Sequence, residues 1–247
     1  MSLASAETPR YRFPSTWSVW TRRDTEMPMQ IVRVTPVRQN CAIFWKKEAV
    51  PARKEAVVID PGGDIDLVMQ VLGDARVEAI LLTHGHFDHA GGVNTLKAHL
   101  AQRGQPDVPV YGLHKDEAFL LNTMADQLAA FLVDASGFET GPVIPDRFLE
   151  EGDVLNLLGR VIRVRHVPGH TPGHIVLIDE TEEVVMTGDA LFRGVVGRTD
   201  FAYGDYDLLI SGIKEKIMSL PDRYKIMPGH GLPSFIHVEK QYNDYFR

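Results

Sequence analysis

The chain has 247 residues, of which 44% are hydrophobic and 24% charged, a composition typical of folded globular proteins and not of disordered or fibrous ones. Its formal net charge of −7 leaves no excess of cations for binding nucleic acid or an anionic membrane. No apolar run approaches the roughly 18 residues that a spanning helix needs. We therefore expect a small-molecule partner, no nucleic acid and no membrane, with the oligomeric state left open.

Residues 1–30 differ from the rest of the chain because they combine arginines with aromatic residues and prolines, and they lack an apolar signal core. We interpret them as an N-terminal extension that is partly disordered. Residues 31–247 contain no linker, fixed-period repeat or low-complexity tract, which predicts a single domain. The lone cysteine, Cys41, is expected in the core, and this sparse cysteine usage fits a reducing, cytoplasmic setting.

Short β-branched runs alternate with helical patterns from residue 31 onward, which indicates a layered α/β fold. In the first half, strands are predicted at residues 31–37, 41–45, 56–59, 77–82 and 108–111. A helix capped by Asp64 carries Leu67, Val68, Val71 and Leu72 at three-to-four spacing. Further helices are predicted at residues 93–102 and 115–124, followed by a helix-and-loop segment at 125–145.

The second half predicts a second sheet, because apolar runs again alternate with turns. Its strands are predicted at residues 154–158, 161–167, 175–178, 184–186 and 224–227. One last helix carries its apolar residues on a single face, at Leu208, Leu209, Ile213, Ile217 and Leu220.

Three histidines and one aspartate fall within six positions directly after the predicted strand 77–82, at His84, His86, Asp88 and His89. Residues two apart in extended backbone point the same way, so His84 and His86 share one pocket. Asp88 and His89 lie where the chain begins to coil and point into a neighbouring pocket. One short loop can thus serve two adjacent metal ions. The alternative is a polar loop whose histidines only satisfy one another.

Three more ligand-type residues follow predicted strands at sharp turns, namely His170, Asp189 and His230. A rigid sheet presents side chains from its edge in this way. In all, five imidazoles and two carboxylates can give two ions three or four ligands each if one carboxylate bridges, which leaves room for water. His174, by contrast, is expected to bond the backbone of its own turn.

The motif Thr-His-Gly-His-Phe-Asp-His at residues 83–89, together with His170, Asp189 and His230, resembles the metallo-β-lactamase superfamily over nearly all of residues 31–247. Segments 170–174 and 191–201 are similar to the glyoxalase II group, especially its short bacterial members. The resemblance implies an α/β fold, an αββα sandwich of two mixed β-sheets flanked by helices, with a two-metal site along one edge. It assigns His84, His86 and His170 to one ion, Asp88, His89 and His230 to the other, and Asp189 as the bridge.

Three residues outside this set are candidates for supporting roles. The resemblance implies that Asp60 hydrogen-bonds a ligand imidazole and fixes its tautomer, whereas the simpler interpretation is that it starts a turn. Arg198 is a candidate substrate contact, because full-length glyoxalase II enzymes use a basic residue near this place for glutathione. The competing interpretation pairs Arg198 with Asp200 or Asp205. Tyr203 is a further candidate for the substrate pocket.

These observations predict a metal-dependent hydrolase that cleaves a thioester, and the resemblance implies S-lactoylglutathione or a related hydroxyacylglutathione as substrate. Metal-bound hydroxide attacks the carbonyl, and the thiol leaves without a strong general acid. Asp88 is the candidate catalytic residue, since it can orient the water or accept its proton. The expected cofactors are two divalent ions, with zinc first and iron or manganese as alternatives, because no cysteine is among the ligands.

Two other functions stay open. A persulfide dioxygenase has a similar Gly-Arg-Thr-Asp-Phe segment and uses a single iron on two histidines and one carboxylate, which would make the protein an oxidoreductase. A non-catalytic module on the same fold should have lost ligands, whereas all seven are present here. β-Lactam hydrolysis is disfavoured as a primary role, because Asp189 stands where those enzymes commonly use cysteine.

Overall fold

The computed structural model describes residues 29–46, 54–131, 134 and 140–247. One six-stranded sheet has the order β1-β2-β3-β4-β5-β6. Strands β1 to β3 pair antiparallel, and β3 to β6 pair parallel. The strands are β1 (Met29–Val34), β2 (Gln39–Trp45), β3 (Glu55–Ile59), β4 (Arg76–Leu82), β5 (Val110–Gly112) and β6 (Arg147–Phe148).

A second six-stranded sheet has the order β14-β13-β10-β9-β8-β7. Strands β7 to β10 pair antiparallel, β13 joins β10 in parallel, and β14 pairs antiparallel with β13. The strands are β7 (Val154–Leu157), β8 (Arg160–His166), β9 (Ile175–Asp179), β10 (Val184–Gly188), β13 (Lys225–Pro228) and β14 (Ser234–Phe235). A separate hairpin joins β11 (Leu191–Phe192) to β12 (Val195–Val196).

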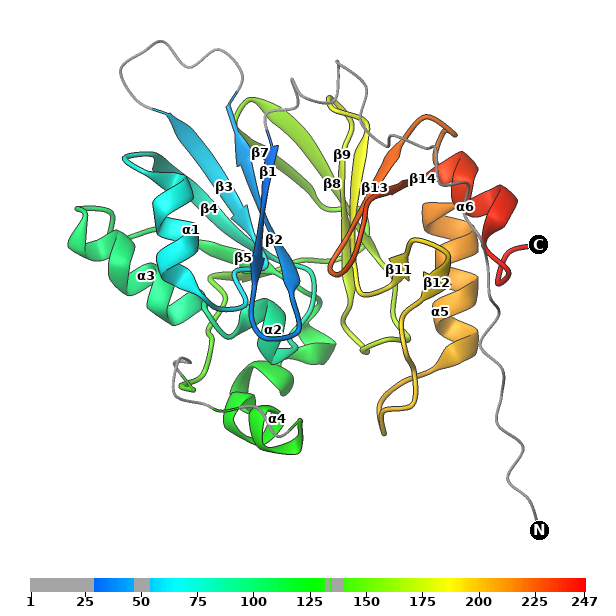
Figure 1. Ribbon diagram of the computed structural model, residues 1–247, viewed down its shortest axis with the longest axis horizontal. Coiled ribbons are helices and arrows are strands. Elements are labelled where there is room, and N and C mark those ends of the chain that lie inside the picture. Colours follow the sequence, from blue (N-terminus) through cyan, green and yellow to red (C-terminus); the bar gives the residue numbers. More distant parts are fainter. Residues whose placement is uncertain (1–28, 47–53, 132–133, 135–139) are drawn as a thin grey trace.

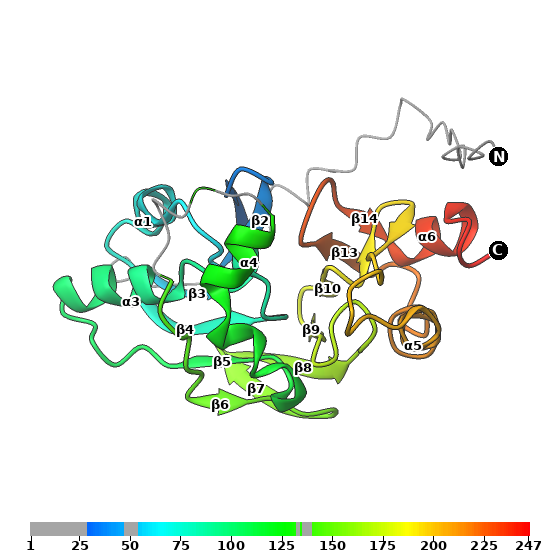
Figure 2. The ribbon, with the colours of Figure 1, turned by 90° about the horizontal axis from the view of Figure 1, so that it is seen from below.

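Helices cover the outer faces of both sheets (Figure 1). Helices α1 (Ile65–Leu72) and α3 (Val93–Gln102) lie on the first sheet. Helix α5 (Tyr206–Gly212), continued by a π-helical turn at Ile213–Ile217, and α6 (Ile236–Tyr242) lie on the second. Helices α2 (Phe87–Ala90) and α4 (Met124–Ala130) lie on one side of the sandwich, beyond the strand ends (Figures 1 and 2). This arrangement confirms the predicted αββα sandwich.

Strand β2 shows why the central strands are apolar throughout. Side chains alternate between the two faces of a strand, so Cys41 and Ile43 pack on the helix side while Ala42 and Phe44 pack between the sheets. All four are buried, at 3% exposure or less. A strand that is buried on both faces has apolar residues at consecutive positions, and this run is the pattern from which the strand was predicted. Burial also raises the pKa of the Cys41 thiol, as befits the predicted core residue.

Several predicted elements differ in detail. Strand β1 begins at Met29, two residues before the predicted domain start, and residues 1–28 lie outside the described part of the chain. Asp64 stands at the N-cap of α1, but its carboxylate makes no cap bond and accepts the Thr35 N–H at 2.7 Å. Leu67 is 45% exposed, because the buried face of α1 is formed by Ile65, Val68, Met69 and Leu72.

The predicted helix at residues 115–124 is wrong. Two short 3₁₀ turns, Lys115–Glu117 and Leu120–Asn122, lead into α4 instead. Within the predicted helix-and-loop segment 125–145, residues 132–133 and 135–139 lie outside the described residues. Strand β14 and helix α6 were not predicted. Among the residues that the structure describes, no helix has the length and apolar character to span a membrane.

Candidate metal centre

The seven predicted side chains come from four turns that follow strands. The loop after β4 carries His84 and His86 and runs into α2, which carries Asp88 and His89. The remaining three side chains follow β8, β10 and β13, at His170, Asp189 and His230. All seven meet, because candidate metal-ligand atoms of these residues lie within 4.8 Å of one another in each of three overlapping groups.

The first group consists of three buried histidines. The Nδ1 atom of His86 lies 3.1 Å from Nε2 of His84 and 3.1 Å from Nε2 of His170. Each histidine therefore turns one ring nitrogen toward the same point, the arrangement of three protein ligands around a divalent cation.

The second group combines two histidines with a carboxylate. Oδ2 of Asp88 lies 3.0 Å from Nε2 of His230 and 3.7 Å from Nε2 of His89. The Asp189 carboxylate lies between the two groups, with Oδ1 at 3.3 Å from Nε2 of His89 and Oδ2 at 3.8 Å from Nε2 of His170. The Asp189 carboxylate thus lies within 4 Å of a histidine from each group.

The outer ring nitrogens of these histidines all have acceptors. His89 Nδ1 donates to Oδ2 of Asp60 at 3.0 Å, the imidazole contact expected of Asp60. His84 Nδ1 donates to the Thr83 hydroxyl at 3.1 Å, and that hydroxyl in turn donates to Asp60 at 2.6 Å. One buried carboxylate thus orients two histidines, one directly and one through Thr83.

The remaining outer nitrogens bond to carbonyls and a phenol. His170 Nδ1 donates to the backbone carbonyl of Arg198 at 2.8 Å, and His230 Nδ1 donates to that of Val37 at 3.2 Å. His86 Nε2 lies 3.0 Å from the Tyr203 hydroxyl. Carbonyl and carboxylate oxygens only accept, so they fix the proton on the outer nitrogen and leave a lone pair on the inner one.

The inner nitrogens of His84 and His170 consequently carry lone pairs, because the outer nitrogens of these two residues donate to acceptors. Burial keeps these imidazoles neutral: it lowers the pKa of His86 to about 3 and lowers the pKa values of His84 and His170. The inner nitrogens of His84 and His170 both lie 3.1 Å from Nδ1 of His86, and all three candidate ligand atoms lie within 4.8 Å of one another, close enough to bind one cation. In the described part of the chain, Nε2 of His89 and Oδ1 of Asp189 are also buried without a hydrogen-bond partner. The donor set therefore fits a pair of metal ions.

The acidic side of the site carries charge. Burial opposes the charge of His89, but Asp189 and Asp88 outweigh it and raise the pKa of this imidazole well above its usual value. Burial likewise opposes ionisation of Asp189 and Asp88, yet His89 and His230 hold the pKa of both carboxyls below the usual range. Both carboxylates are therefore ionised at neutral pH and ready to bind cations.

Glycine is required where the backbone passes closest to the site. A Cβ at Gly229 would lie 2.3 Å from Oδ1 of Asp189 and 2.5 Å from Cε1 of His89. At Gly62 it would lie 1.4 Å from the carbonyl oxygen of Asp88. These two glycines give the Asp88, His89 and Asp189 side chains the room in which they converge.

The two candidate substrate contacts have different surroundings. The Arg198 guanidinium forms two hydrogen bonds with Asp200, at 2.6 and 2.8 Å, and lies 4.5 Å above the Phe201 ring. It thus follows the competing interpretation, while its backbone carbonyl orients His170. Tyr203 stacks on Phe201 beside His86, and burial raises the pKa of its phenol to about 12.

His174 also differs from its expectation. Its Nε2 accepts the backbone N–H of Asp189 at 3.0 Å instead of bonding its own turn. This bond holds the start of the Asp189 turn from the residue directly before the neighbouring strand, β9. His166 makes the turn contact instead, through its Nε2 and the Pro172 carbonyl at 2.9 Å.

Two buried residues that sequence reasoning missed support the loop around His86. Glu117 accepts hydrogen bonds from the Gly85 N–H, the Thr171 hydroxyl and the Gly173 N–H. Gln127 accepts from the Phe87 N–H at 3.0 Å and donates to the Gly85 carbonyl at 3.2 Å. Glu117 lies in a Lys-Asp-Glu run that looks like a solvated face, so its sequence carries no sign of this role.

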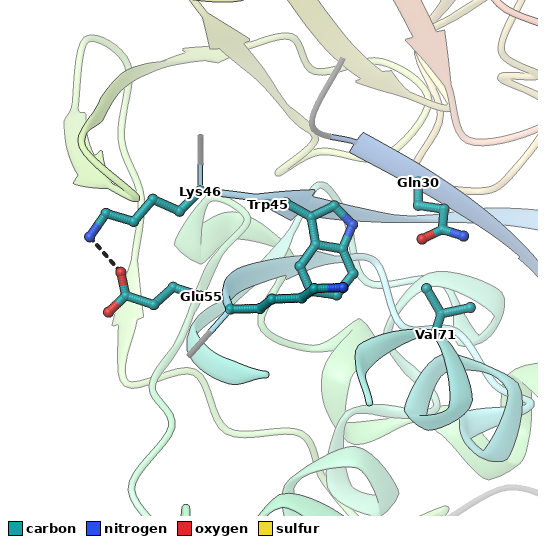
Figure 3. Close-up of a pocket in the computed structure, with 6 residues that line it drawn as sticks. Gln30, Trp45, Lys46, Glu55 and Val71 are labelled. Atoms are coloured by element: carbon teal, nitrogen blue, oxygen red, sulfur yellow. Dashed lines mark hydrogen bonds and ion pairs between the residues drawn. The ribbon is translucent and has the colours of Figure 1, made fainter. Parts of the chain in front are cut away.

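A pocket of about 330 Å³ lies at the far end of β2 from the metal centre, beside Trp45 and Val71 (Figure 3). Its rim carries the Lys46–Glu55 ion pair, and Lys54 lies 5.7 Å from the Trp45 ring centre. It contains none of the predicted site residues.

The fold is an αββα sandwich, and its histidine–aspartate cluster could hold a pair of metal ions. The Metallo-beta-lactamase superfamily profile matches residues 34–230, and the chain belongs to this superfamily. It is 39% identical to hydroxyacylglutathione hydrolase GloC of Haemophilus influenzae, over 89% of this chain and 98% of that protein.

Two solved structures are similar along most of their length. One is TTHA1623 in a di-iron-bound form, with a TM-score of 0.74 and 33% identity, covering 87% of this chain and 99% of that one. The other is the BLEG-1 B3 metallo-beta-lactamase, with a TM-score of 0.76 and 31% identity, covering 88% and 99%. These likenesses confirm the superfamily that the motifs indicated.

Proposed function

We propose that this protein is a binuclear metal-dependent hydrolase of thioesters, with S-lactoylglutathione or a related hydroxyacylglutathione as substrate. The observation that carries the proposal is the convergence of five histidine ring nitrogens and two ionised carboxylates in three overlapping groups, with candidate ligand atoms within 4.8 Å of one another in each group. The 39% identity to a hydroxyacylglutathione hydrolase over nearly its whole length supports the substrate class.

We assign His84, His86 and His170 to one ion, Asp88, His89 and His230 to the other, and Asp189 to both. Two divalent ions, when bound, supply an acidified water and an electrophile for the thioester carbonyl. Zinc is our first candidate for both ions. Iron is the alternative, because imidazole and carboxylate donors without cysteine suit either metal. The similar TTHA1623 structure in its di-iron form supports iron as the alternative.

The chain's own groups hold and move the proton. Asp88 stands at the more open side of the site, with a His230 side chain that is 26% exposed as its hydrogen-bonding neighbour. We assign Asp88 to orienting the attacking water and accepting its proton. A thiolate leaves more readily than an alkoxide, since a thiol has a pKa of about 8.5, so no separate general acid is needed.

The test pairs metal analysis with a thioester panel on purified protein. We expect two ions per chain, turnover of S-lactoylglutathione, and loss of turnover on chelation with recovery when metal returns. Asp189→Ala should lose at least one ion and about 100-fold or more of the rate, because it removes the bridge between the ions. Asp222→Ala, an exposed carboxylate that pairs with Lys240, is the matched control and should keep both properties.

The outcomes separate the alternatives. One iron per chain with oxygen uptake on glutathione persulfide, and no thioester cleavage, would replace the proposal by a persulfide dioxygenase. Absence of bound metal under all loading conditions would indicate a non-catalytic module. An Asp189→Ala variant with unchanged metal content and rate would remove the bridging assignment.

A further inference from the structure

Glu117 is a buried acid that neither the motifs nor the proposed chemistry uses. It ends the 3₁₀ turn Lys115–Glu117, and its side chain is fully buried. Oε1 accepts the N–H of Gly85, while Oε2 accepts the Thr171 hydroxyl at 2.6 Å and the Gly173 N–H at 2.9 Å. Within the described residues no lysine or arginine pairs with it, so these donors alone compensate its burial.

These three donors belong to the two segments that carry the first histidine group. Gly85 lies between His84 and His86, and Thr171 directly follows His170. The segments come from different sheets, since the first follows β4 and the second follows β8. Glu117 is therefore a direct link between the two halves of one metal subsite.

The packing around this link leaves little freedom. A Cβ at Gly173 would lie 2.4 Å from Cβ of Glu117, and one at Gly85 would lie 3.3 Å from its Oε1. The Gly173 carbonyl accepts the His114 N–H at 2.8 Å, so the segment that carries Glu117 contacts this turn at a second point. The Glu117 side chain thus packs closely against both histidine-bearing segments.

We propose that Glu117 is a positioning residue that holds the segments around Gly85 and Thr171 at the separation at which His84, His86 and His170 bind one metal ion. The inference rests on the metal centre of the proposed function. It does not depend on which substrate is hydrolysed, because its readout is metal binding.

The proposal makes the two ions respond differently. The second group is organised by other contacts, namely Asp60 on His89 and the Val37 carbonyl on His230. Loss of Glu117 should consequently weaken the ion held by His84, His86 and His170 and leave the other ion unchanged. A general loss of stability would weaken both.

The experiment uses Glu117→Gln, which keeps the shape of the side chain but turns an NH₂ group toward N–H or O–H donors. It is made in two backgrounds, His230→Ala to isolate the first subsite and His170→Ala to isolate the second. Metal-free protein is titrated with Co²⁺, and visible absorption reports the dissociation constant. We expect an increase of about 10- to 100-fold in the His230→Ala background and no change in the His170→Ala background.

Glu239→Gln is the matched control for folding. Glu239 is fully buried and accepts hydrogen bonds from Ser234, Gly194 and Asn243, but none of these residues flanks a histidine of the first group. It should lower the free energy of unfolding without changing either dissociation constant. If Glu117→Gln does not fold, Thr171→Val removes one of the three hydrogen bonds and should show the same selectivity with a smaller effect.

Equal weakening of both ions by Glu117→Gln, or unchanged binding of the first ion, would overturn the proposal. So would a Glu239→Gln variant that loses Co²⁺ affinity to the same extent. Failure of the proposed function has a separate signature, namely normal selective Co²⁺ binding without any thioester turnover in the unsubstituted protein.

Discussion

At the scale of single residues, the site requires glycine at position 229, because no side chain fits between the backbone and the proposed ligands there. Gly229→Ala should abolish binding of the ion near His89, because the new Cβ would lie 2.3 Å from Oδ1 of Asp189 and 2.5 Å from the His89 ring. Backbone and ligands have to shift to relieve that overlap. Metal analysis after dialysis should show one ion fewer per chain than in the unsubstituted protein.

Gly141→Ala provides the comparison for this prediction. Its Cβ would meet only the Asn94 side chain, at 3.8 Å, which is ordinary contact. That variant should retain both ions. Two ions in the Gly229→Ala protein would show that the Asp189 turn adapts to the extra methyl group.

At the scale of elements, strand β2 positions a ligand that lies far along the chain. The Asn40 amide is buried and donates to the carbonyls of Pro228 and Gly231, at 3.0 and 3.1 Å, on either side of His230. Asn40→Ala leaves both carbonyls without this donor, which should cost about 1–3 kcal/mol of unfolding free energy. It should also raise the dissociation constant of the His230 ion about tenfold.

Urea unfolding and Co²⁺ titration measure these two effects. Asn122→Ala is a suitable control, because its exposed amide donates only to the Ala118 carbonyl of its own turn. A variant Asn40→Ala with full stability and unchanged metal affinity would show that the Asn40 side chain is not needed to hold His230.

The elements that could be predicted from the sequence are those whose burial leaves a local pattern. Strands such as β2 and β4 are buried on both faces and read as apolar runs. Helix α6 escaped prediction, since its seven residues include the buried, charged Glu239, whose partners Ser234 and Gly194 are visible only in the fold. The 3₁₀ turns before α4 escaped for the same reason: tertiary contacts, not periodicity, define them.

The same distinction separates ligand-type residues from their supports. The seven histidines and aspartates follow strands at sharp turns, and this repeated pattern can be recognised in the amino-acid sequence. Glu117 and Asn40 act across sheets, on segments far away in sequence, so nothing near them in the chain reveals what they bond. Sequence reasoning therefore found the groups that face the proposed ions and, among their supports, Asp60, but it missed Glu117 and Asn40.

At the scale of the whole molecule, the buried neutral histidines make the metal-free fold sensitive to acid. Burial lowers the pKa of His174 well below 6.5, and the neighbouring His170 acts in the same direction. The unfolded chain takes up a proton near pH 6.5 and the folded chain does not, so this contribution to stability is complete above that pH and is lost as pH falls. Between pH 7 and pH 5 the loss for one such histidine is about 2 kcal/mol.

His174→Gln isolates this contribution, because its side-chain oxygen reaches the position of the histidine Nε2 and can still accept the Asp189 N–H, while the titrating group is gone. The measurement is the free energy of urea unfolding of chelator-treated protein at pH 7 and pH 5. The variant is expected to be less stable at pH 7, since a flexible amide fills the space of the imidazole ring less well, but to lose about 2 kcal/mol less on acidification. Parallel losses in the two proteins would mean that His174 accepts a proton within the folded state.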